Sequence, residues 1–389
     1  MSKKRGNGEG SITVHKASNR YMAQYTKPNG KRGTVYGKTR EEARRKLTKA
    51  LSDIQSNTYT DKNKITLIEI TKSIVEDRHN SNKTRDNSYR ANLDTIKRIE
   101  KDDIATMQIQ KINTEHLKEY FNKIANEYSN SIIRKNYGLM NASFRKAITK
   151  GYIMRNPFDN KEELQIPKSK RQDKKISCFT LSEQKEIIEA LNKYENKTYK
   201  NIILLALYSG MRSGEILALK VNDIDFKNKI IHIQRTLTKD VKAKTIIGEN
   251  TKTINSLRDI KITTIIEKIL NESMKMFRFN ENNLVFCNSE GNVITNGMIN
   301  SAFKRLCEKY NINKGFDVNF HMLRHTYATT CIESGMPAKV VQKKLGHRDI
   351  SITLNTYAEV LANYEDTCDS AYLEYLEANK LGCSKIAVK

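Results

Sequence analysis

The chain has 389 residues, and its 69 Lys and Arg against 44 Asp and Glu give a formal net charge of 69 − 44 = +25. A balance this basic indicates a polyanionic partner, most commonly nucleic acid. No apolar run reaches the roughly 18–20 residues that span a bilayer, and the first residues lack the apolar stretch of a secretory signal. The six cysteines include no C-x-x-C pair, so we expect reduced thiols, no disulfide framework and a cytoplasmic protein.

Residues 1–60 are strongly basic, with 14 Lys and Arg against 4 Asp and Glu, a local net charge of 14 − 4 = +10. Three runs of alternating apolar and polar residues predict strands, and a capping box of Thr39 and Glu42 predicts a helix after them. The three runs lie around residues 12–14, 21–25 and 35–37. A small basic sheet of this kind fits the major groove of DNA. The alternative is a solvated basic face on an interaction module.

Apolar residues recur at helical spacing through residues 62–160, which predicts a wholly helical domain. Thr66 and Glu69 form a capping box near its start. Residues 161–175 are predicted to be a basic linker, because positions 168–175 hold five basic residues, one acidic residue and no apolar residue.

The remaining residues, 176–389, mix helical and strand-like patterns. A capping box of Thr180 and Glu183 precedes one helix, and a buried helix follows at 202–208. Strand-like runs lie at 230–234, 258–262 and 283–287, and a tail helix is predicted at 358–381. The predicted fold class is α+β and mainly helical, with an N-terminal sheet and helix, a helical domain, and a mostly helical C-terminal domain that contains a small sheet.

Several residues suited to phosphate chemistry lie in the C-terminal domain. His321 and Arg324 form an H-x-x-R motif, and residues three apart on a helix share a face. A Gly-His dipeptide ends at His347, Tyr357 follows ten residues later, and Arg212 lies far upstream in a Ser-Gly-Met-Arg-Ser-Gly-Glu run. Each motif alone is common, whereas the order Arg, strand-borne Lys, H-x-x-R, Gly-His and Tyr is specific.

With this ordered set, residues 175–380 resemble the tyrosine recombinases, the phage-integrase family. The sequence is most similar to integrases of temperate phages and conjugative transposons that carry an N-terminal arm-binding domain. The resemblance implies a site-specific DNA recombinase that works through a 3′-phosphotyrosyl intermediate and a Holliday junction. It also implies that residues 1–60 bind arm sites, that 62–160 form a SAM-like core-binding domain, and that 176–389 form the catalytic domain.

The resemblance places the family's catalytic positions on six residues of this chain. They are Arg212, Lys252, His321, Arg324, His347 and the nucleophile Tyr357. Lys239, Lys242 and Lys244, on the same hairpin and loop as Lys252, are alternatives for the role of that lysine. The resemblance further implies that Glu215 supports the basic cluster, and the alternative for Glu215 is a helix-start acid near the helix dipole.

Phosphodiester cleavage requires a nucleophile, stabilisation of a five-coordinate transition state and a proton for the leaving oxygen. Arg212 and Arg324 are suited to clamp the non-bridging oxygens with forked, permanently charged donors. His347 can add a third donor if it is protonated or in the right tautomer. The phenol of Tyr357 becomes a phenoxide, and His321 accepts its proton or orients it.

Lys252 can protonate the leaving 5′-oxygen, and the covalent bond keeps the energy of the phosphodiester, so no ATP is required. Since three cations already neutralise the phosphate, we expect no cofactor and no metal. The expected partners are double-stranded DNA at core and arm attachment sites, a homo-tetramer on DNA, and an excision factor or a host DNA-bending protein. The tail helix is expected to dock either on a neighbouring protomer or on its own domain.

Two other functions are compatible with the basic composition. A type IB topoisomerase shares the tyrosine chemistry, but the arm-like domain and the compact catalytic region argue against it. A catalytically inactive DNA- or RNA-binding regulator would be expected to lack Arg212, Arg324 or Tyr357, and all three are present.

Overall fold

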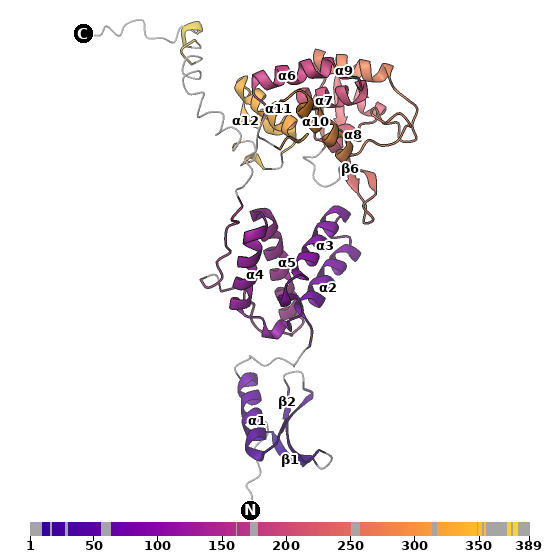
Figure 1. The fold of residues 1–389 in the computed structure, drawn as a ribbon. Coiled ribbons are helices and arrows are strands. Elements are labelled where there is room, and N and C mark those ends of the chain that lie inside the picture. The colour runs from indigo at the N-terminus through magenta and orange to yellow at the C-terminus, as the bar shows by residue number, and fades with distance from the viewer. Residues whose placement is uncertain are drawn as a thin grey trace, which may run out of the picture. The chain divides into compact units, whose positions relative to one another are not determined.

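The computed structural model of the chain divides into two units, Met1–Asp173 and Lys174–Lys389 (Figure 1). The residues that it describes are 10–15, 18–27, 30–55, 64–160, 162–171, 178–249, 257–312, 317–347, 349–351, 354, 372–374 and 376–379. Over these residues the chain is mainly helical with small sheets, which confirms the predicted fold class. No helix in the described ranges is long and apolar enough to cross a membrane.

A three-stranded antiparallel sheet and one helix form the N-terminal part of the chain. In sheet order the strands are β1 (Ser11–His15), β2 (Arg20–Thr26) and β3 (Arg32–Gly37), and the helix is α1 (Arg40–Gln55). Alternation along β2 turns Ala23 and Tyr25 towards Leu47 of α1, where they form a small core. Gly37 lets the chain turn closely into α1, because a Cβ there would lie 2.5 Å from the backbone nitrogen of Ala43.

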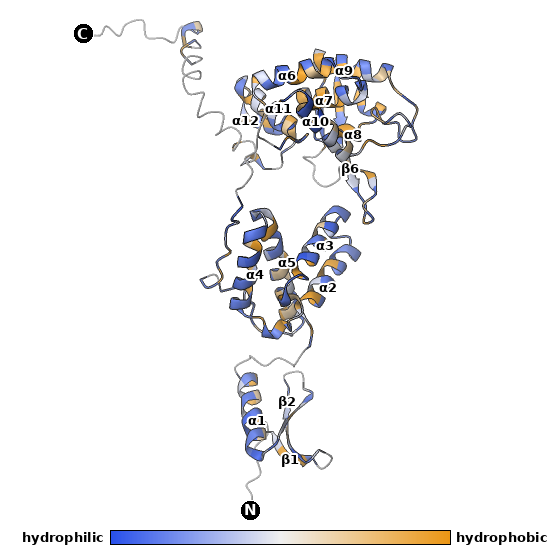
Figure 2. Cartoon of the chain, in the orientation of Figure 1, coloured by the Kyte–Doolittle hydropathy of each residue, from blue (hydrophilic) through white to orange (hydrophobic). Residues whose placement is uncertain are grey.

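Four helices with short 3₁₀ turns form the next part. They are α2 (Leu67–Asn80), α3 (Asp86–Ile99), η1 (Asp103–Ala105), η2 (Ile109–Lys111), α4 (Thr114–Glu127) and α5 (Asn130–Thr149). The predicted capping box of Thr66 and Glu69 is present at the start of α2. Apolar faces pack into one core around Phe121 and Phe144, whereas the visible faces of α3 and α4 are mainly hydrophilic (Figure 2).

The described part of the predicted linker, residues 162–171, lies along α4 and α5. Leu164 joins the apolar core of these helices. The backbone nitrogen of Lys170 donates to the carbonyl of Ala125 at 2.9 Å, and that of Ser169 donates to the side chain of Asn130 at 2.8 Å. These contacts fix the first part of the segment to the helical domain.

Seven named α-helices, one 3₁₀ helix and two small sheets are described in the second unit. The helices are α6 (Leu181–Asn192), α7 (Lys197–Ser209), α8 (Ser213–Leu217), η3 (Val221–Asp223), α9 (Thr264–Lys275), α10 (Asn296–Lys309), α11 (Met322–Glu333) and α12 (Ala338–Leu345). The strands are β4 (Ile224–Asp225), β5 (Ile230–Ile233) and β8 (Arg258–Lys261) in one sheet, and β6 (Arg235–Lys239) and β7 (Thr245–Glu249) in a separate antiparallel pair.

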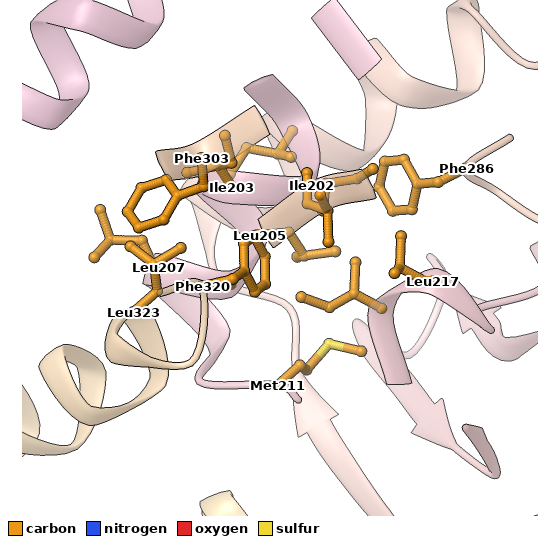
Figure 3. Packing of buried hydrophobic residues seen from close by; sticks show 14 of the residues in the cluster. Ile202, Ile203, Leu205, Leu207, Met211, Leu217, Phe286, Phe303, Phe320 and Leu323 are labelled. Carbon is orange, nitrogen blue, oxygen red and sulfur yellow. The ribbon is translucent and has the colours of Figure 1, made fainter. Parts of the chain in front are cut away.

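Helix α7 runs through the core of this unit and is apolar on nearly every side, as a central helix must be. Its residues Ile202, Ile203 and Leu205 are fully buried and pack with Phe303 of α10 and Leu323 of α11 (Figure 3). The end of α7 and the start of α11 are therefore held rigidly, and these are the places where the motif residues lie.

The structure differs from the predicted strands in two places. Residues 283–287 are not a strand, because the Asn280 side chain takes both backbone groups of Leu284, accepting from its nitrogen at 2.8 Å and donating to its carbonyl at 2.9 Å. Only isolated bridges, such as the one from Leu284 to Lys220, remain there. The β6–β7 pair was not among the predicted strand runs, although Lys239, Lys242 and Lys244 were expected to lie on a hairpin and loop. Most of the predicted tail helix lies outside the described residues, although 372–374 and 376–378 are helical.

Candidate active site

The turn between α7 and α8 positions Arg212. Gly210 ends α7 in the left-handed conformation, with φ of 64°, and a Cβ there would lie 2.3 Å from the ring of Tyr327. Arg212 then caps α8, and its backbone N–H donates to the carboxylate of Glu215 at 2.9 Å. The glycine and the glutamate of this sequence run thus set the position from which the Arg212 side chain extends.

Arg324 lies in the first turn of α11, with only 3% of its surface exposed. Its guanidinium donates to the carbonyl oxygens of Gly210 at 2.7 Å and Leu345 at 2.6 Å. Burial, followed by the charge of Arg212, lowers the pKa of Arg324 to about 9, so the side chain is still a cation at neutral pH. Because both acceptors are uncharged, they leave its positive charge largely available to an anion.

Glu215 lies at the centre of the cluster, with 2% of its side chain exposed. Its carboxylate accepts from Nη1 of Arg212 at 2.7 Å, in addition to the capping hydrogen bond. It also accepts from Nη1 and Nη2 of Arg258 at 3.0 Å and 2.7 Å. Burial acts to raise the pKa of Glu215, but the hydrogen bonds and charges of Arg258 and Arg212 outweigh it and hold the pKa at about 2.

Arg258 was missed by the sequence analysis. It is the first residue of β8, its side chain is 6% exposed, and its Nε donates to the carbonyl of Lys344 at 2.9 Å. A signal was available, because Arg258 stands two residues before the buried Ile260 and strand residues two apart share a face. A charged residue on the apolar face of a predicted strand indicates a buried partner.

The cluster carries a surplus of positive charge that suits a phosphodiester. Three arginines, Arg212, Arg258 and Arg324, surround one ionised carboxylate, so the net charge is 3 − 1 = +2. Arg212 is the accessible member, with 39% of its side chain exposed. Attack by a phenoxide on a phosphodiester anion produces a transition state with two negative charges, which this surplus matches.

Two predicted histidines lie beside the arginines and are neutral at physiological pH. Burial, with the neighbouring His325 and the arginines, lowers the pKa of His321 to about 4. Burial, with Arg324 and Arg212, lowers the pKa of His347 to about 4 as well. The structure therefore favours His321 as a proton acceptor, and His347 as a donor through its neutral tautomer. His325 contacts His321 edge-on, with ring centroids 4.8 Å apart.

Lys252 and Tyr357 lie outside the described residues, so their roles remain predictions from the sequence. Of the alternative lysines, Lys239 ends β6, and Lys242 and Lys244 lie between β6 and β7. Of the described residues, no three His, Cys, Asp or Glu form a group that could hold a metal ion.

Two family models match the chain over the parts that hold these features. The phage integrase family model matches residues 178–363, which include the arginine cluster. The phage integrase SAM-like domain model matches residues 66–164, the helical part of the first unit.

The chain is also similar to individual recombinases and to solved structures. It is 30% identical over 292 residues to the integrase of Staphylococcus phage L54a, covering 69% of this chain and 82% of that protein. It is 29% identical over 361 residues to a tyrosine recombinase XerC-like protein of Caldanaerobacter subterraneus, covering 86% and 90%.

Among solved structures, the Tn1549 transposon integrase in complex with a circular intermediate DNA matches with a TM-score of 0.66 and 21% identity, covering 75% of this chain and 95% of that one. A lambda integrase tetramer bound to a Holliday junction matches with a TM-score of 0.54 and 18% identity, covering 91% and 96%. The matching models, the relatives and the arrangement of the arginines lead to one conclusion: the chain belongs to the tyrosine recombinase (phage integrase) family, whose members bind, cleave and rejoin DNA.

Proposed function

We propose that this chain is the integrase of a bacterial mobile element, acting on the DNA of its host in the cytoplasm. It recombines two duplexes through a 3′-phosphotyrosyl intermediate and a Holliday junction. The single observation that carries the proposal is the convergence of Arg212 and Arg324, from α8 and α11, on the end of α12 where His347 follows. The integrase of Staphylococcus phage L54a and the transposase of transposon Tn916, which are both similar to this chain, support it.

The two arginines divide the binding of the scissile phosphate. Arg324 is buried and its guanidinium is held by two carbonyl oxygens, so the position of its positive charge is fixed. Arg212 is partly exposed, with Nη1 bound to Glu215 and Nη2 bound to the carbonyl of Gly346, so the N–H groups that these two bonds leave over can donate to the non-bridging oxygens. Pre-arranged donors of this kind act chiefly on charge that develops in the transition state.

The remaining groups supply proton transfer and the covalent step. Neutral His321 receives the phenolic proton as the oxygen of Tyr357 attacks phosphorus, and His347 donates a hydrogen bond to a phosphate oxygen. The bond from phosphorus to the 5′-oxygen breaks, and Lys252 donates a proton to that oxygen. A 3′-phosphotyrosine and a free 5′-hydroxyl result, and religation runs the same steps in reverse.

The N-terminal sheet is proposed to read arm sites through the face opposite α1. Cross-strand pairs on that face join Gln24 to Thr34 and Thr26 to Arg32, and Arg20 is exposed at the start of β2. Arginine and glutamine side chains are the usual readers of guanine and adenine edges, and short strands fit the major groove.

The tail is proposed to join protomers into a tetramer on DNA. A pocket of about 640 Å³ beside the arginine cluster is lined by Lys339, Lys343 and Lys344 of α12 and by Lys261 of β8. Residues 358–380 hold six acidic residues against one lysine, which gives them the opposite charge. The lambda integrase tetramer on a Holliday junction supports this assembly. An excision factor or a host DNA-bending protein remains an additional proposed partner.

A nicked suicide substrate tests the proposed chemistry. The wild-type chain should accumulate a covalent protein–DNA adduct, and Tyr357→Phe should form none while binding the same DNA with unchanged affinity. An adduct retained by Tyr357→Phe would place the nucleophile elsewhere.

Deletion of residues 1–60 tests the proposed arm-binding domain. The shortened chain should still form the adduct at core sites but should no longer bind arm sites, and persistence of arm binding would refute the domain assignment.

A further inference from the structure

We propose that Arg258 is a positioning residue for the recombination reaction, which holds Glu215 and the last turn of α12 so that Arg212 and His347 meet the scissile phosphate. The inference rests on the proposed function, and it concerns a residue outside the motifs from which that function was predicted.

The end of α12 is the first observation. The last carbonyl groups of a helix have no intrahelical donor and lie at the negative end of its dipole. Three successive carbonyls there each receive an arginine from a different element. Lys344 accepts from Arg258, Leu345 from Arg324 and Gly346 from Arg212, at 2.9, 2.6 and 3.1 Å. This turn leads directly into His347, so the three arginines together fix where the imidazole begins.

The second observation is how Arg258 binds Glu215. Its two terminal nitrogens take one carboxylate oxygen each, a forked geometry that prevents the carboxylate from rotating. Arg212 shares the oxygen Oε1 through Nη1. The direction of the Arg212 side chain therefore depends on a carboxylate whose orientation is set by Arg258.

The charges explain why Arg258 positions other groups of the site and does not itself bind the phosphate. Its guanidinium is paired with a carboxylate on both terminal nitrogens, whereas both hydrogen bonds of Arg324 go to neutral carbonyls. Arg258 cancels the charge of Glu215, and the net +2 that remains belongs in effect to Arg212 and Arg324. Without Arg258, the described hydrogen bonds of Glu215 would all come from Arg212, which would reduce the charge that Arg212 offers to DNA.

Single-turnover cleavage of a suicide substrate, measured beside DNA affinity, tests the role. Arg258→Gln should slow adduct formation by up to about 100-fold, the size expected when a catalytic group is misplaced by about 1 Å. Its DNA affinity should stay within about threefold of wild type, and Arg258→Lys should recover part of the rate. A loss of affinity as large as the loss of rate would show that Arg258 binds DNA, and would overturn the proposal.

The pH profile separates positioning from general structure. The charged groups that face Glu215 are Arg212 from α8, Arg258 from β8, and Arg324 from α11. Burial raises the pKa of Glu215 and Arg258 lowers it. Removing Arg258 should therefore raise this pKa, so that the carboxyl takes up a proton more readily as pH falls. The rate of Arg258→Gln should therefore fall more steeply than the wild-type rate as pH is lowered towards the ordinary pKa of a glutamate. In a Glu215→Gln background this acid limb should disappear. An unchanged profile would contradict the inference.

Arg235 provides a matched control in the same unit. Its Nη1 donates to both oxygens of the buried Asp223, at 2.5 and 2.7 Å, a pair that shares no residue with the arginine cluster. Arg235→Gln should lower thermal stability but leave cleavage rate and pH profile as in the wild type. If both variants lose rate equally, the effect is structural and the inference fails. If the wild type itself forms no adduct, the proposed function fails instead.

Discussion

The basic residues of the N-terminal sheet and those of the arginine cluster differ in environment, and the difference shows what each set can do. Arg20 and Arg32 are exposed on strands with a small core. Arg258 and Arg324 are buried, with their hydrogen bonds directed into the protein. Exposed cations exchange counterions and give salt-dependent affinity, whereas buried and paired ones are weakly screened and fix geometry. The net charge of +25 therefore combines two functions.

Replacement of Arg324 should have the largest effect among variants of the described residues. Arg324→Ala removes a transition-state donor and should lower the cleavage rate by about 10²–10³-fold. It also leaves the carbonyls of Gly210 and Leu345 without their donor, which should cost about 2 kcal/mol of unfolding free energy. Single-turnover cleavage and denaturant unfolding measure the two losses.

Arg212→Ala is the informative partner of that variant. Since Arg212 is partly exposed, the Arg212→Ala variant should lose a similar factor in cleavage rate, but its loss of unfolding free energy should be much smaller. Equal stability losses in the two variants would contradict the division between a fixed and an accessible arginine.

Paired substitution in the sheet should produce the next largest effect. Arg20→Gln with Arg32→Gln should weaken arm-site binding and lower the slope of log affinity against log salt by about 2, because each arginine is expected to neutralise one phosphate. Core-site cleavage should not change. The control is Arg44→Gln with Arg45→Gln, which removes the same charge from exposed positions on α1. If both pairs behave alike, the sheet carries bulk charge and makes no specific contact with DNA.

Acid unfolding should reveal the buried carboxylate. The pKa of Glu215 is depressed from its ordinary 4.5 to about 2, so its stabilisation is present above pH 4.5 and is lost as pH falls towards 2. The wild type should lose unfolding free energy over this window, and Glu215→Gln should show a shallower slope despite lower stability at neutral pH. Parallel curves for the two proteins would place the acid sensitivity in other carboxylates.

Chelation should have the smallest effect. Arg212, Arg324 and Lys252 are proposed to supply the positive charge at the phosphate, so cleavage should continue unchanged in EDTA. Inhibition that is reversed by added Mg²⁺ would mean that these side chains are insufficient.

Local patterns predicted the parts of the fold that local physics decides. Period-two alternation gave β1–β3, and the capping boxes at Thr66 and Thr180 lie where expected. The predicted strand at 283–287 was wrong. Its apolar run could not reveal that the Asn280 side chain forms hydrogen bonds with both the backbone nitrogen and the carbonyl of Leu284. The packing of residues 162–171 on α4 and α5 likewise depends on contacts that composition does not encode.

The site divides in the same way. Arg212, His321, Arg324 and His347 were predicted from motif order and Glu215 from the family resemblance, and their elements meet in space. Arg258 stands in no recognised motif, and its role arises only where β8, α8 and α12 come together. The protonation states of His321 and His347 also required burial, which a single sequence gives only as a tendency.

The proposed covalent mechanism is tested most directly by identifying the residue that becomes attached to DNA. Wild-type protein is trapped on a suicide substrate, digested with protease and nuclease, and analysed by mass spectrometry. We predict a nucleotide joined through its 3′-phosphate to the peptide that contains Tyr357, and far less of this peptide after the same reaction time when Arg324 is replaced by Ala. A nucleotide attached to another residue, or linked through a 5′-phosphate, would contradict this prediction.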